Sequence, residues 1–101
     1  MEYVYVITNP AFPDYCKLGL TTQESPEKRL GNYNTGSPYR DYKLEHYVET
    51  HDCKTLEREL HLNIKDAGFV LRNEWAQIPV PLAISLLETT ATDVAADPQE
   101  A

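Results

Sequence analysis

A chain of 101 residues with a formal net charge of −7 is long enough for one domain, and its acidity argues against strong non-specific DNA binding. Hydrophobic residues make up 42% of the sequence and charged residues 25%, as in ordinary globular domains, and no run of about 18 apolar residues could span a membrane. The sequence also begins without a signal-like apolar run. We therefore expect a cytoplasmic protein in which Cys16 and Cys53 are free thiols.

The acidic charge is unevenly distributed. Residues 88–101 contain four acidic residues and no Lys or Arg, so the rest of the chain has a net charge of only −3. A local basic face can still form, from Lys17, Lys28, Arg29, Arg40 and Lys43.

The first half of the chain predicts a hairpin followed by a helix. Residues 2–8 and 15–21 are rich in aromatic and β-branched side chains, which favour strands. The intervening segment contains two prolines, which mark a turn. Ser25 followed by Pro26 is typical of a helix start, and this helix should run to about Tyr33.

The second half predicts a further strand over residues 39–50 and a helix over 53–66, with Asp52 as its N-cap. Residues 69–71 and 74–78 should be short extended pieces, and residues 82–88 a last helix. We expect the domain to cover residues 1–88 and the acidic residues 89–101 to be a disordered tail. The predicted fold is α+β, with a small three-stranded antiparallel sheet flanked by helices.

Side chains capable of phosphate chemistry are spread along these elements. Tyr3 and Tyr5 share one face of the first strand, where core packing is the simpler explanation. Lys17 is followed by Gly19, which permits close backbone approach. Arg29 could hold a phosphate with its forked donors, and Tyr33 lies one turn later on the same helix face.

A second helix adds a carboxylate. Glu57 and His61 are four residues apart and can face one site, where Glu57 could bind a hard cation such as Mg²⁺ or could simply be a helix-edge carboxylate. His61 is more often structural than catalytic in such a place. Asn73 could bind a phosphate or make a turn.

Six short blocks of sequence occur in a fixed order: YVYVITNP at 3–10, KLGLT at 17–21, PEKRL at 26–30, NTGSP at 34–38, LERELH at 56–61 and NEW at 73–75. Together they resemble the GIY-YIG nuclease superfamily and, within it, the phage T5 open-reading-frame 172 type of domain, often labelled DNA-binding. The resemblance covers most of the chain. Tyr3 stands where the first motif has its glycine, and Lys17 where the second motif usually has tyrosine.

The resemblance implies a role for each matched residue. Tyr5 would be a general base or position a water, with Lys17 lowering its pKa across the hairpin. Arg29 would bind the phosphate, Tyr33 would match a His or Tyr, and Glu57 would hold the single metal ion. The accessory and DNA-binding candidates are Tyr3, Gly19, Lys28, Arg40, His61 and Asn73.

The leading hypothesis is thus a Mg²⁺- or Mn²⁺-dependent endonuclease domain acting on DNA, from a phage or a bacterium. One alternative is a module of the same fold that binds nucleic acid without cutting it. Another is an inhibitor-like protein whose acidic surface binds a protein, which the charge of −7 favours. So small a domain would bind DNA weakly unless it formed a homodimer or joined a partner.

Overall fold

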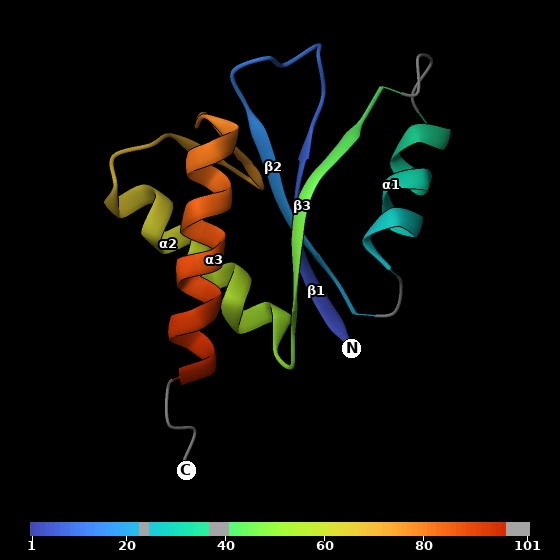
Figure 1. The fold of residues 1–101 in the computed structure, drawn as a ribbon. Coiled ribbons are helices and arrows are strands. Elements are labelled where there is room, and N and C mark those ends of the chain that lie inside the picture. The colour runs from blue at the N-terminus through green and yellow to red at the C-terminus, as the bar shows by residue number, and fades with distance from the viewer. Residues whose placement is uncertain (23–24, 37–40, 97–101) are drawn as a thin grey trace.

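A computed structural model describes residues 1–22, 25–36 and 41–96 as an antiparallel sheet with helices on both faces (Figure 1). The strands are β1 (Glu2–Thr8), β2 (Cys16–Thr21), β3 (Lys43–Thr50), β4 (Leu71–Arg72) and β5 (Trp75–Ala76), in the order β3-β1-β2-β5-β4. The helices are α1 (Pro26–Thr35), α2 (Cys53–Asp66) and α3 (Val80–Ala96). Helix α1 covers one face of the sheet, whereas α2 and α3 lie together on the other. None of the helices within these ranges is long and apolar enough to cross a membrane.

Strand β1 is buried on both faces because helices cover both. Val4 and Val6 point into the main core, together with Leu18 of β2 and the apolar face of α2. Tyr5 alternates with them and faces α1 instead, where it is 1% exposed. One face of β1 therefore contributes to the core, and the other places Tyr5 beneath α1.

The expectation of a three-stranded sheet is wrong, since the sheet has five strands. The two additional strands come from the segment after α2. Asn73 adopts a left-handed conformation with φ of 56°, which reverses the chain between β4 and β5. Trp75 then lies opposite Lys17, and this pairing adds the small hairpin to the edge of β2.

The last helix is also longer than expected, because α3 continues past Glu88 to Ala96. Thr90 lies in the segment assigned to a disordered tail, yet it is 1% exposed. Its hydroxyl donates to the Leu86 carbonyl at 2.6 Å and accepts from Asn63 Nδ2 at 2.9 Å. This contact with α2 stabilises the added turns. Residues 97–101 and Arg40 lie outside the described residues, and the domain boundary at 88 stays a prediction.

Local capping explains where α1 and α2 begin. The Ser25 hydroxyl accepts from the Lys28 backbone N–H at 3.2 Å, and Asp52 Oδ1 accepts from the Thr55 N–H at 3.1 Å. Both helices therefore start where the sequence predicts. Helix α1 ends at Thr35, two residues later than expected.

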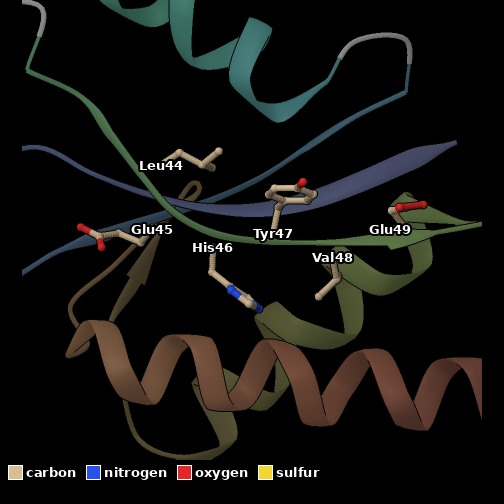
Figure 2. A pocket seen from close by; sticks show the side chains of 6 residues that line it. All are labelled: Leu44, Glu45, His46, Tyr47, Val48 and Glu49. Carbon is tan, nitrogen blue, oxygen red and sulfur yellow. The ribbon is translucent and has the colours of Figure 1, made fainter.

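Strand β3 is an edge strand with a bulge. Val6 lies opposite His46 and Ile7 opposite Leu44, so Glu45 has no partner in β1. Leu44 and Tyr47 point toward α1, whereas His46 points toward α3, where it pairs with Glu88 (Figure 2). Residues 44–49 line a shallow groove of about 620 Å³ along this edge. The candidate site residues in the described part of the chain lie elsewhere, on β1, β2, α1 and α2 and at the turn between β4 and β5.

Candidate functional site

The site begins with a close contact between β1 and β2. Tyr5 lies opposite Gly19, and its ring occupies the space that a side chain at position 19 would need. A Cβ atom there would come within 2.7 Å of the Tyr5 hydroxyl oxygen and 2.8 Å of two ring carbons. Gly19 thus lets the Tyr5 ring lie against the backbone of β2, which directs the phenol toward α1.

Helix α1 supplies a second phenol and a guanidinium. The hydroxyl oxygens of Tyr5 and Tyr33 are 3.0 Å apart, within hydrogen-bond distance. The Arg29 Cζ atom lies 5.3 Å from the centre of the Tyr33 ring, and the Lys17 Nζ atom lies 5.5 Å from the same ring. Both distances suit cation–π attraction. We call Tyr5, Lys17, Arg29 and Tyr33 the tyrosine–cation cluster.

Lys17 is held by the small hairpin as well as by Tyr33. Its ammonium is 3.2 Å from Glu74 Oε1 and 5.7 Å from the centre of the Trp75 ring. The Lys17 side chain is 17% exposed, so this ion pair is partly shielded from water. Glu74 therefore offsets much of the positive charge that Lys17 brings to the cluster.

Glu57 lies on α2, near enough to Lys17 and Glu74 for both charges to act on its carboxyl. The Leu18 backbone N–H donates to the Glu74 carbonyl, while the Leu18 carbonyl is 3.3 Å from His61 Nε2. His61 therefore lies against the edge of β2 at the point where the pairing with β5 ends. Glu57 precedes His61 by one turn of α2 and shares its face of the helix.

The Glu57 carboxyl is unusual for its environment. Its Oε2 atom is buried and has no hydrogen-bond partner among the described residues. Burial, and then the nearby carboxylate of Glu74, raise the pKa of Glu57 to about 7, against a smaller opposite effect of Lys17. A buried polar atom without a partner is costly, and such atoms are often explained by a bound ion or water.

The environment of the Tyr5 phenol raises its pKa. Burial, and then the hydrogen bond with Tyr33, raise the pKa of Tyr5, and the hydrogen bond from Arg29 only partly offsets this. The raised pKa does not favour the expected role of Tyr5 as a base near neutral pH, and the role of Tyr5 stays a prediction. At neutral pH its phenol is protonated and suited to donating or relaying a hydrogen bond.

A hard divalent cation fits the donor chemistry at Glu57. A single buried carboxylate oxygen without a hydrogen bond is the kind of ligand that Mg²⁺ takes along with several waters. The described residues contain no group of three or more His, Cys, Asp or Glu that could hold a metal together. Any ion at Glu57 would thus rely on water or a substrate for most of its ligands.

The remaining candidates lie around this centre or away from it. The Lys28 side chain is exposed on α1, and Asn73 is exposed at the turn between β4 and β5. Tyr3 stacks edge-on against Tyr47 at 5.7 Å, on the β3 side of the sheet. Arg40 lies outside the described residues. Glu74 is the partner that sequence reasoning missed, because only strand register brings it to Lys17.

Two searches gave no support from characterised relatives: neither the curated proteins nor the solved structures contain a significant match. The sequence profile of the T5orf172 domain, in contrast, matches residues 2–91. This match includes every element from β1 to most of α3 and therefore the four residues of the tyrosine–cation cluster and Glu57. The chain belongs to the T5orf172 domain family.

Proposed function

We propose that this domain is a GIY-YIG-like endonuclease that hydrolyses phosphodiester bonds in DNA with one divalent cation. The observation that carries the proposal is the meeting of two cations and two phenols, from β1, β2 and α1, beside a buried carboxylate oxygen without a partner. The T5orf172 family is consistent with a nuclease-like or DNA-binding module. The proposal places the enzyme in the cytoplasm, where its DNA would be.

Each side chain in the cluster has a distinct part in this proposal. Arg29 binds a non-bridging phosphate oxygen with its forked donors while its plane rests near the Tyr33 ring. Tyr5 stays protonated, and its hydrogen bond with Tyr33 orients the Tyr33 hydroxyl, which faces the substrate. Lys17 contributes positive charge, which its ion pair with Glu74 partly offsets.

Glu57 is the proposed metal ligand. With Mg²⁺ or Mn²⁺ bound there, the cation would supply positive charge to the phosphate oxygens as negative charge builds up on them. The carboxylate must be ionised to bind it. Because the pKa of Glu57 is raised to about 7, metal affinity should increase as pH rises through neutrality.

A plasmid-nicking assay at low salt tests this function, with Mg²⁺ and then Mn²⁺. We expect nicking by the wild-type protein and loss of nicking in Arg29→Ala and Glu57→Gln. The matched controls are Arg58→Ala and Glu59→Gln, since on α2 Arg58 is exposed, Glu59 is partly exposed, and the two pair with one another at 3.8 Å. Both controls should nick at the wild-type rate.

Other outcomes would favour the rival functions. DNA binding that depends on Arg29, without any nicking, would identify a module that holds nucleic acid without cutting it. Absence of both binding and nicking in the folded protein would favour a protein partner for its acidic surface. Nicking that survives Glu57→Gln would refute the role given to Glu57.

A further inference from the structure

A second hollow lies next to the tyrosine–cation cluster, on the far side of Lys17. It has a volume of about 260 Å³. Three of its lining side chains are aromatic and two are polar: Phe12, Tyr15, Trp75, Arg72 and Asn73. None of these residues has a part in the function proposed above.

The loop between β1 and β2 presents Phe12 to solvent in a defined position. Phe12 is 48% exposed, and its ring lies 5.4 Å from the Trp75 ring at an angle of 60°. Its backbone N–H donates to the Asn9 carbonyl at 2.9 Å, and the buried Asn9 side chain donates to Asp41 at 3.2 Å. The loop is thus organised without burying the Phe12 ring, so a role in core stability does not explain the phenylalanine.

Lys17 joins this hollow to the cluster. Its ammonium lies 5.7 Å from the Trp75 ring and 5.5 Å from the Tyr33 ring, so it stands between the two. Arg72 is exposed at the hollow and forms no ion pair with any residue in the described ranges. An aromatic hollow with a free cation, adjoining a phosphate-binding cluster, matches the alternation of base and phosphate along a nucleic-acid strand.

We propose that the hollow formed by Phe12, Trp75 and Arg72 binds an unpaired nucleobase next to the phosphate held by the cluster. The substrate class is then DNA with a single-stranded segment, because a paired base inside a duplex cannot reach an aromatic pocket without leaving its stack. This inference rests on the proposed function, which it deepens. The bound base stacks on the aromatic rings, while Arg72 contacts the flanking phosphate.

The chain contains one tryptophan, so intrinsic fluorescence reports directly on the hollow. The experiment titrates Glu57→Gln protein, which should not cut, with a short oligothymidylate and with a duplex of equal length. Binding is measured in parallel by anisotropy of a label on the DNA. We expect the single strand to quench Trp75 and to bind more tightly than the duplex.

Variants at the hollow sharpen the test. Phe12→Ala should weaken single-strand binding about 5- to 100-fold, the range for loss of one stacked base, with little change for the duplex. Phe12→Leu keeps apolar area but lacks an aromatic face, and should resemble Phe12→Ala. Leu62→Ala removes another exposed apolar side chain, on α2, and should bind like its parent. Because Phe12 is half exposed, these variants should remain folded.

The outcomes separate this inference from the function that it deepens. Wild-type nicking together with an oligothymidylate that binds without quenching Trp75 would overturn the base pocket alone. Equal single-strand affinity of Phe12→Ala and its parent would also overturn the base pocket. A change in Trp75 fluorescence with a protein partner but not with DNA would overturn it as well. Quenching that depends on Phe12, without any nicking, would support the pocket and refute cleavage.

Discussion

Replacing Gly19 with alanine perturbs the close contact between β1 and β2 that positions the Tyr5 phenol. The added Cβ would lie 2.7–2.8 Å from the end of the Tyr5 ring, closer than carbon atoms approach without displacement. The ring is 1% exposed and bonded to Tyr33, so it cannot swing into solvent. Overpacking of this kind costs about 1–3 kcal/mol. The lower unfolded-state entropy of alanine offsets about 0.5–1 kcal/mol of this.

We therefore expect Gly19→Ala to lower the free energy of unfolding by up to about 2.5 kcal/mol, and the melting temperature by up to about 20 °C. Urea denaturation followed by circular dichroism would measure the change. DNA binding should weaken too, because the displaced phenol can no longer meet Tyr33.

Gly31→Ala is the matched control, since an added Cβ at position 31 of α1 has no atom within 4 Å. It should stabilise the protein by about 0.5–1 kcal/mol. Tyr5→Leu removes the ring, so Gly19→Ala should cost little in that background, giving a coupling energy of about 1–2 kcal/mol in a double-mutant cycle. Equal effects of the two glycine substitutions, or additivity within the cycle, would refute the steric explanation.

Substitutions at three further residues test the electrostatics and the capping. Because the pKa of Glu57 is raised from 4.5 to about 7, the folded state holds an extra proton between these values, so stability should fall as pH rises through that window. Glu57→Gln should flatten this pH dependence. At pH 8 it should raise the free energy of unfolding, measured by urea denaturation, by about 1–3 kcal/mol, allowing for the partial exposure of the side chain. An unchanged pH profile would contradict this. Glu74→Gln should lower the pKa of Glu57 in a carboxyl NMR titration, and an unmoved midpoint would show that the two carboxylates do not interact. Asp52→Ala should lower the urea midpoint and Asp52→Asn much less, because asparagine can still accept from the Thr55 N–H; equal midpoints would show that the cap contributes nothing.

Features set by neighbouring residues could be predicted from the sequence. The N-caps Ser25 and Asp52 act within their own first turns, and the alternation of Val4, Tyr5 and Val6 assigns the two faces of β1. The pair of Glu57 and His61 follows from helical spacing alone. These predictions needed no knowledge of how distant segments meet.

Features set by distant partners could not be predicted. The sequence predicts short extended pieces at residues 69–71 and 74–78, where β4 and β5 lie, but not that β5 pairs with Cys16 and Lys17 of β2 and so enlarges the sheet. The last turns of α3 depend on the contact between Asn63 and Thr90. The raised pKa of Tyr5 required knowing that α1 would bury its phenol. In each case the missing information was tertiary.

The attachment of α1 has a consequence for how the site opens. Pro26 is the only buried residue of this helix, whereas α2 buries four. Two hydrogen bonds between Asn34 and the backbone of Tyr42, just before β3, hold α1 in place, together with the hydrogen bonds of Tyr33 and Arg29 to the Tyr5 phenol. Amide protons of α1 should thus exchange with solvent through local opening, at a lower free energy than those of α2. Arg29 and Tyr33 move with α1, so closing it over a ligand can tune affinity while the core stays folded.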